Sequence, residues 1–334
     1  MKQPLRFIDL FAGIGGIRLG VEQALTQHGM VSECVLTCEI DKHAKTTYDA
    51  NFSCQNFATD ITQLHEHGVP QHDLLLAGFP CQPFSQAGLK QGFADTRGTL
   101  FFDIERILSY KKPAFFLLEN VKQLQGHDKG RTLKIILEHL TNLGYKLHYQ
   151  VLNAKHFGIP QNRERIYIVG FLDPDVSQRF NFPSPPITET TVGQILETDV
   201  ADKYTLSTTL WQGHQRRKAE HKAKGYGFGY SLFQADSPYT STISARYYKD
   251  GSEILIEQAN RNPRKLTPRE AARLQGFPDS FTLPVSDCQA YKQLGNSVPV
   301  PVVQAVVEQM LLAVISQVVS PPIVAHQQHL SLAC

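Results

Sequence analysis

The chain contains 334 residues, of which 42% are hydrophobic and 19% charged, and 33 Lys and Arg against 31 Asp and Glu give a net charge of +2. This length allows one large core and a smaller second domain, because single cores stop growing near about 250–300 residues. No apolar run approaches the roughly 18 residues of a membrane span, and the first residues lack a secretory signal pattern. We therefore expect a cytoplasmic protein without a membrane partner, and the near-neutral charge leaves a nucleic-acid partner open.

The six cysteines do not form a recognisable metal or disulfide pattern. They stand at positions 34, 38, 54, 81, 288 and 334, and none belongs to a CxxC pair. Their spacing fits neither a zinc site nor a disulfide framework. We expect reduced thiols and no bound metal ion.

Strand-like and helical segments alternate over the first 170 residues. The segments that read as strands are 6–11, 34–40, 73–78, 114–120, 145–154 and 165–171. The segments with helical spacing are 16–29, 100–110 and 130–145. This alternation predicts an α/β fold with a doubly wound, mainly parallel sheet and helices on both faces.

The alternation of strand-like and helical segments weakens after the proline-rich stretch "NFPSPPITET" at 181–190. Helical order returns at "LTPREAARLQGFP", where Thr267 suits the N-cap, Pro268 the first helical position and Glu270 the capping box. An apolar helix at 297–319 is expected to pack back on the first part of the chain. The predicted organisation is a catalytic domain at 1–185 plus 290–320, a smaller domain at 186–289 and a flexible tail at 321–334.

The segment "FIDLFAGIGGIRLG" ends a strand and opens a helix through a glycine-rich turn. Glycines let the main chain approach a ligand closely, as a cofactor-binding turn requires. Arg18 stands where a dinucleotide fingerprint needs its third glycine, so the pattern departs from an NAD site. Glu39 closes the next strand and is placed to accept hydrogen bonds from ribose hydroxyls, and Asp60 closes a third segment where it can accept an adenine amino group. The alternative is a plain tight turn with solvated carboxylates.

The segment "LLLAGFPCQPFSQAG" places Cys81 between two prolines, three residues after a buried strand ends. Ligands of doubly wound sheets bind beyond the carboxyl ends of the strands, so Cys81 should face the same crevice as the glycine turn. The prolines restrict the backbone, and a nucleophile gains from a fixed approach to its target. Taken alone, the thiol is better explained by the more common role of a free cysteine, that of a small buried hydrophobic residue.

Other polar residues at strand ends favour the catalytic interpretation. Glu119 follows the apolar run "AFFLL", where partial burial raises the pKa of a carboxyl group. Arg163 and Arg165 stand two residues apart and are expected on one side of an extended segment. An arginine can hold a ligand oxygen and lower the pKa of a nearby thiol. Thiol, carboxyl, arginine and a nucleotide-binding turn are the groups needed to activate a pyrimidine.

The order of these motifs resembles that of bacterial DNA (cytosine-5)-methyltransferases over nearly the whole chain. "DLFAGIGG" and Glu39 are followed by "TDI", "GFPCQPFS", "ENV", "QNRERIYIVG", "RKLTPREAARLQGFPDSF" and "YKQLGNSVPVPV". The resemblance implies S-adenosylmethionine as methyl donor and cytosine in duplex DNA as acceptor. It assigns the cofactor site to Phe11, Gly13, Ile14, Gly16, Glu39, Ile40, Asp60, Ile61, Pro80, Leu100, Asn296, Ser297 and Val298.

The resemblance also implies a mechanism. The Cys81 thiolate adds to C6 of cytosine while Glu119 protonates or hydrogen-bonds N3. Arg165 should hold the cytosine O2, with Arg163 supporting the geometry. The base must leave the duplex stack, and segment 85–98, with Ser85 and Arg97 as expected DNA contacts, should close over it. We expect a monomer, accompanied at most by a restriction endonuclease without a stable complex.

Target recognition is expected in the variable region 186–262. Arg216, Arg217 and Lys218 lie in a basic run that suits phosphate contact, although such runs are more often solvated faces. Arg246 and Lys249 lie among aromatic residues, and Arg246 either reads guanine in the major groove or is structural. Both stretches resemble recognition regions of family members whose sites begin with CC and end with GG.

Three other classes of protein remain to be weighed. An NAD-dependent oxidoreductase is disfavoured by Arg18 and by the Pro-Cys-Gln turn. A tRNA cytosine methyltransferase would use the same chemistry, but the long basic insert favours duplex DNA. A non-catalytic DNA-binding module is disfavoured by the intact set of thiol, carboxyl and arginine.

Overall fold

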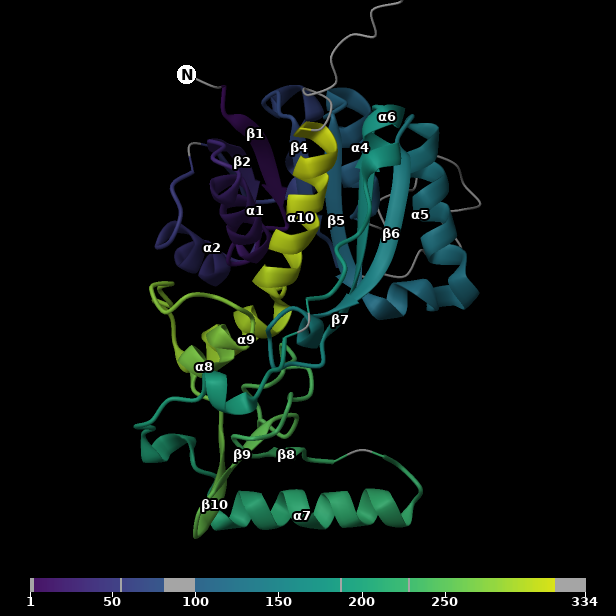
Figure 1. The fold of residues 1–334 in the computed structure, drawn as a ribbon. Coiled ribbons are helices and arrows are strands. Elements are labelled where there is room, and N and C mark those ends of the chain that lie inside the picture. Colours follow the sequence, from purple (N-terminus) through teal and green to yellow (C-terminus); the bar gives the residue numbers. More distant parts are fainter. Residues whose placement is uncertain (1–2, 55, 81–99, 187, 228, 316–334) are drawn as a thin grey trace, which may run out of the picture.

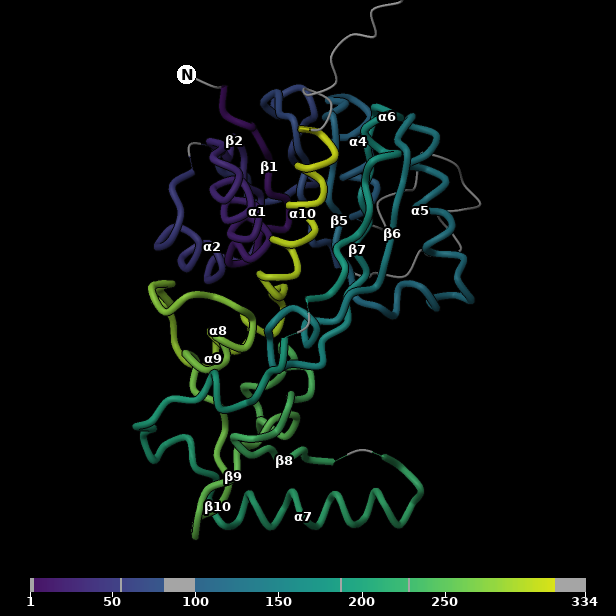
Figure 2. The backbone as a smooth tube through the Cα atoms, viewed as in Figure 1, coloured from purple at the N-terminus to yellow at the C-terminus, as the bar shows by residue number. Residues whose placement is uncertain are grey.

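The computed structural model describes residues 3–54, 56–80, 100–186, 188–227 and 229–315, which form a large α/β lobe and a smaller lobe beneath it (Figure 1). Figure 2 follows the chain from the large lobe into the smaller one and back again through the last helix. Cys81, Ser85, Arg97 and the expected tail at 321–334 lie outside the described residues.

The large lobe is built on a seven-stranded sheet with the order β3-β2-β1-β4-β5-β7-β6. The strands are β1 (Leu5–Leu10), β2 (Ser32–Cys38), β3 (Phe57–Ala58), β4 (Leu74–Gly78), β5 (Phe115–Val121), β6 (Lys146–Asn153) and β7 (Glu164–Phe171). β1 to β5 pair in parallel, and β7 pairs antiparallel with β5 and β6. The predicted mainly parallel α/β fold is therefore confirmed.

Helices cover both faces of this sheet. α1 (Gly16–Gln27), α6 (Pro174–Arg179) and α10 (Val300–Ile315) pack on one face, and α4 (Phe101–Lys111) and α5 (Arg131–Asn142) pack on the other. In β4, Leu74 and Leu76 point into the first layer while Leu75 points into the second. Burial on both faces is why these strands read as continuous apolar runs in the sequence.

The last helix is a core element. Gly20 of α1 lies so close to α10 that an added Cβ would stand 2.9 Å from the Val303 side chain. By length and composition, the stretch Asp287–Ile315 is apolar enough to cross a membrane, so the expectation that no run approaches a membrane span needs correction. This stretch is apolar because it packs in the protein interior, where Val302, Val306 and Met310 belong to the core between α10, α1 and the sheet.

The smaller lobe contains a three-stranded sheet and one long polar helix. Its elements are α7 (Thr208–Ala223), β8 (Leu232–Phe233), β9 (Leu255–Gln258), β10 (Arg261–Lys265), α8 (Pro268–Arg273) and α9 (Asp287–Asn296). α8 begins as predicted, with Thr267 and Glu270 forming a capping box and Pro268 in its first turn. The hydrophobic core of this lobe also includes Ile14 and Ala44 from the large lobe. The domain boundaries remain predictions.

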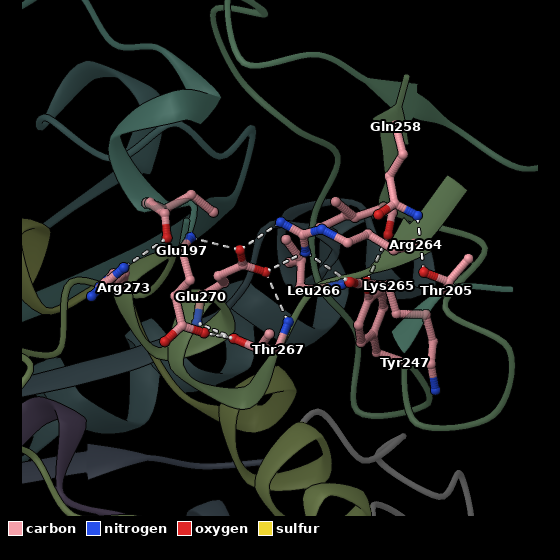
Figure 3. Close-up of polar contacts among 12 residues, drawn as sticks. Glu197, Thr205, Tyr247, Gln258, Arg264, Lys265, Leu266, Thr267, Glu270 and Arg273 are labelled. Carbon is pink, nitrogen blue, oxygen red and sulfur yellow. Dashed lines mark hydrogen bonds and ion pairs between the residues drawn. The ribbon is translucent and has the colours of Figure 1, made fainter. Parts of the chain in front are cut away.

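A buried ion pair organises the smaller lobe near α8 (Figure 3). The Arg264 guanidinium donates to both carboxylate oxygens of Glu270, at 2.7 and 2.8 Å. The main-chain N–H groups of Glu197 and Thr267 donate to the same carboxylate, each at 2.8 Å. Both charged side chains are buried, and such a pair is tolerated in a core only when these remaining hydrogen bonds are made.

Four cysteines lie within the described part of the chain. Cys34 and Cys38 are buried in β2, Cys54 is half-buried and Cys288 is exposed, and all four are free thiols. No group of three or more His, Cys, Asp or Glu side chains within the described ranges is arranged to hold a metal ion.

Candidate active site

A cavity of about 380 Å³ lies at the carboxyl ends of β1, β2, β4 and β5. This edge of a doubly wound sheet is where such folds bind ligands. The sequence-predicted residues that line it are Phe11, Gly13, Ile14, Gly16, Glu39, Pro80, Glu119, Arg165, Asn296, Ser297 and Val298. Residues assigned to the cofactor and to the cytosine therefore share one cavity, although the strands that carry them are far apart in the sequence.

The turn between β1 and α1 needs its glycines for two different reasons. Gly13 has a φ of +54°, and an added Cβ there would meet no atom within 4 Å. At this position the left-handed backbone conformation favours glycine, and the open space beside it leaves room for a ligand to approach the main chain. An added Cβ on Gly16 would stand 2.6 Å from the Ser297 Oγ and 3.1 Å from the Val298 side chain, so glycine allows the C-terminal "NSV" segment to pack closely on the turn.

Glu39 fixes the turn to the end of β2. Its Oε2 accepts a hydrogen bond from the Gly13 N–H at 2.7 Å, and its Oε1 accepts one from the Asp41 N–H at 2.7 Å. Each carboxylate oxygen can accept a further hydrogen bond, so a held Glu39 still offers acceptors to the cavity.

Glu119 and Arg165 form an ion pair in the wall of the cavity. The Arg165 Nε lies 3.1 Å from the Glu119 Oε1, and these side chains are only 13% and 10% exposed. They come from the antiparallel neighbours β7 and β5. Burial raises the pKa of Glu119, and the nearby guanidinium groups of Arg165 and Arg163 oppose that rise without cancelling it. Gly78 faces Glu119 from β4, where an added Cβ would lie 3.5 Å from the carboxylate.

Asn120 is a site residue that the sequence interpretation did not single out. Its buried side chain donates a hydrogen bond to the Phe79 carbonyl at 2.9 Å. This bond joins the end of β5 to the residue before Pro80, which lines the cavity and directly precedes Cys81. The sequence feature that could have indicated Asn120 is the "ENV" motif, from which only Glu119 was assigned a role.

Arg163 lies outside the lining of the cavity. Its side chain is buried, and the guanidinium donates to the carbonyls of Ile243 at 2.9 Å and Gly295 at 3.0 Å, and to that of Ser297. The two arginines have different partners, because Arg165 pairs with Glu119 while Arg163 donates to main-chain carbonyls, yet both guanidinium groups lie near enough to Glu119 to oppose the rise of its pKa. Its contacts make Arg163 a connection between the large lobe, the smaller lobe and the "NSV" segment.

Four predicted cofactor residues do not belong to the cavity lining. Ile40 is 70% exposed, and Ile61 is buried in the core between the sheet and α4. Asp60 caps the short helix Ile61–Gln63 by accepting from the Thr62 N–H at 2.9 Å. Leu100 directly precedes α4. Their roles toward a cofactor remain predictions.

Two residues of α9 line the cavity and form polar pairs there, which the sequence did not predict. Lys292 and Asp41 both line the cavity and form an ion pair at 3.3 Å. Gln293 also lines it, and its Oε1 accepts a hydrogen bond from the Thr47 Oγ1 at 2.9 Å. Both residues stand just before the "GNSV" motif, which was the signal for them.

The predicted DNA-contacting residues in the described ranges all lie in the smaller lobe. On α7, Arg216 pairs with Glu220 at 3.8 Å, and Arg217 pairs with Asp250 at 3.3 Å. The Lys218 Nζ donates to the Tyr230 carbonyl at 2.9 Å. Arg246 and Lys249 are exposed in the turn that follows Ser244. Their contacts with DNA remain predictions.

Fold and site together define an α/β enzyme of the methyltransferase class. The family model for C-5 cytosine-specific DNA methylases matches residues 5–312, and the chain belongs to that family. The enzyme is accordingly a DNA (cytosine-5-)-methyltransferase, which confirms what the motif order implied.

Several relatives cover most of the chain. It is 66% identical over 308 residues to the type II methyltransferase M.NlaX of Neisseria lactamica, covering 92% of this chain and 96% of that protein. It is 43% identical over 366 residues to the DNA-cytosine methyltransferase of Escherichia coli K12, covering 90% of this chain and 76% of that protein. The crystal structure of S. pombe Dnmt2 methyltransferase shares the fold, with a TM-score of 0.72, 22% identity and coverage of 94% and 98%.

Proposed function

We propose that the enzyme uses S-adenosylmethionine to methylate C5 of a cytosine flipped out of duplex DNA, through a covalent bond between Cys81 and C6. The observation that carries this proposal is the buried Glu119–Arg165 pair, which lies in one cavity with Pro80 and the glycine turn. The role of Cys81 is proposed from the sequence, in which this residue directly follows Pro80.

The cavity fits the proposed methyl donor. Its volume of about 380 Å³ lies within the roughly 300–1,000 Å³ typical of small-ligand sites. The open space at Gly13 allows close approach to the main chain, and Glu39 offers carboxylate acceptors for ribose hydroxyls. When bound, S-adenosylmethionine supplies an electrophilic methyl group. Phe11 and Asn296 also line this space and complete the proposed binding surface.

The chain's own residues prepare the cytosine. The Cys81 thiolate forms a bond to C6, and the Glu119 carboxyl group donates its proton, or a hydrogen bond, to N3. The electron density displaced by these two steps makes C5 nucleophilic. Arg165, whose Nε lies 3.1 Å from the Glu119 carboxylate, is proposed to hold the cytosine O2. After methylation, N3 returns its proton to Glu119, C5 loses its proton to water and the C6–sulfur bond breaks, which regenerates the Cys81 thiolate.

The test is transfer of tritium from methyl-labelled S-adenosylmethionine to duplex DNA, with tRNA as the competing acceptor. Wild-type enzyme should label DNA, and Cys81→Ala should label neither acceptor while still binding the methyl donor. DNA carrying 5-fluorocytosine should trap wild-type enzyme covalently, because C5 cannot release fluorine as a cation. Measurable turnover by Cys81→Ala would remove the adduct from the mechanism.

We also propose that residues 186–289 select a site of the CC…GG type. The support is the position of Arg246 and Lys249 on the smaller lobe, together with the basic helix α7. We further propose that the enzyme is a cytoplasmic monomer that acts on nucleoid DNA. Its similarity to type II methyltransferases supports an accompanying restriction endonuclease, which is proposed not to bind it stably. Bisulfite sequencing of DNA from expressing cells reads the modified cytosine and its flanking bases together, and a different site would overturn the assignment.

A further inference from the structure

One face of α7 is packed against the rest of the smaller lobe. Trp211 contacts Tyr230 edge to face, with ring centroids 4.6 Å apart. Lys218 lies over the same ring at 4.1 Å, and the Lys218 side chain fills the space beside Gly229. His214 is the buried residue of this helix. α7 is therefore fixed in orientation and does not hang freely on the surface as a basic run in solvent would.

The packed face of α7 contacts the 246–250 turn through Asp250. The Arg217 guanidinium lies 3.3 Å from the Asp250 carboxylate, and the His214 ring is near enough to Asp250 that this residue opposes the lowering of the pKa of His214 by burial. The Ser252 N–H donates to the other carboxylate oxygen at 3.1 Å. These contacts fix the C-terminal end of the turn to the helix.

The N-terminal side of the same turn is fixed against the cavity. Gly295 lines the cavity, and an added Cβ on Gly295 would stand 2.3 Å from the main chain of Ser244 and Ala245. Within the turn, the Tyr247 hydroxyl donates to the Ile254 carbonyl at 2.6 Å and accepts from the Leu266 N–H at 2.8 Å. The turn thus runs from the cavity to α7.

Only the exposed side chains of the turn are left to meet DNA, and these are Arg246, Tyr248 and Lys249. A side chain reads a base edge only when it lies within hydrogen-bond distance of it. The position of the turn therefore decides which bases these exposed side chains can reach. We propose that Arg217 is a positioning residue for sequence recognition, which orients this turn through Asp250. The proposal rests on the proposed function, in which the smaller lobe selects the target site.

Arg216 is the matched control on the neighbouring position of the same helix. Its side chain is 77% exposed, and its ion pair with Glu220 stays within α7. An arginine of this kind suits a phosphate contact, which adds affinity for every sequence alike. The Arg217–Asp250 pair, with side chains 50% and 31% exposed, contributes little to stability, so variants at either residue should fold.

The experiment is methylation of a DNA library with randomised flanking bases, at two salt concentrations, by wild type, Arg217→Ala, Arg216→Ala and Arg246→Ala. Arg217→Ala should reduce discrimination by about two- to fivefold, the range set by a half-exposed ion pair, at the same base pair that Arg246→Ala affects more strongly. Arg216→Ala should weaken binding to all sequences, lower the salt dependence and leave the preference unchanged. The exchange variant Arg217→Asp with Asp250→Arg should recover the preference lost in Arg217→Asp alone.

The outcomes separate this proposal from the one on which it rests. A uniform loss of affinity in Arg217→Ala, with a lower salt dependence and no recovery in the exchange variant, makes Arg217 a phosphate contact and overturns the inference. An unchanged preference in Arg246→Ala shows that the turn does not read bases. Absence of site preference in the wild type would contradict the proposed function itself.

Discussion

Replacing Glu119 by Gln removes the carboxyl proton of this residue and keeps the shape of its side chain. Glutamine has nearly the same size and keeps an oxygen that can accept a hydrogen bond from Arg165, but it has no carboxyl proton to give to N3. We expect the single-turnover rate to fall by roughly 10²–10⁴, the range for loss of a general acid. At about 1.4 kcal/mol per tenfold change, this is about 3–5.5 kcal/mol of barrier.

The pH dependence has a definite sign. Burial raises the pKa of Glu119, so the carboxyl group keeps its proton to a higher pH than an exposed glutamic acid does. The general acid is active when protonated, and the wild-type rate should therefore fall as the pH rises through the pKa of Glu119 in the DNA complex. Glu119→Gln should lose this dependence and keep its low rate across the range.

The assay is rapid-quench transfer of labelled methyl groups with enzyme in excess over DNA, and equilibrium dialysis measures donor binding separately. Glu164→Gln is the matched control, because Glu164 is an exposed carboxylate near Arg165 whose partner, Lys122, lies 2.8 Å away at the surface. The control should keep both its rate and its pH profile. A Glu119→Gln rate within about threefold of wild type would refute the assigned role, since general acids contribute far more.

Three further predictions concern the parts around this pair. Gly16→Ala should destabilise the fold by about 1–3 kcal/mol and weaken donor binding, because its Cβ would press on Ser297, and urea unfolding with dialysis measures both. Arg163→Met should cost about 3 kcal/mol or more in urea unfolding, since it leaves three main-chain carbonyls without their charged donor; a near-native midpoint would contradict this. Replacing 186–262 by the same region of a relative should change the methylated site and not the chemistry; bisulfite sequencing of an unchanged site would show that recognition lies elsewhere.

The sequence predicts the sheet and the cavity well because both depend on local patterns. Parallel strands buried on two faces appear as apolar runs, and their polar end residues must meet at one edge of the sheet. Glu39 and Glu119 were found in this way, and both line the cavity. The segment 16–29 with helical spacing corresponds to α1, which ends at Gln27, two residues before Gly29 with its φ of +61°.

Features that depend on partners distant in the sequence were not predicted. α7 is polar on nearly all sides and buries only His214, so it shows no amphipathic period. Its position depends on Trp211 against Tyr230 and on Arg217 against Asp250, and nothing in the spacing of these residues indicates such pairs. The basic run was therefore interpreted from its charge alone, without the helix that orients it.

The segment from Gln161 to Arg165 connects recognition to chemistry within five residues of sequence. Gln161 is buried, donates to the Leu274 carbonyl at 2.7 Å and accepts from the Ile243 N–H at 3.0 Å. Arg163 donates to the carbonyl of the same Ile243, whereas Arg165 holds Glu119 in the cavity. Because one short stretch contacts the smaller lobe at its start and the proposed acid at its end, the lobe that carries Arg246 is fixed in relation to the cavity.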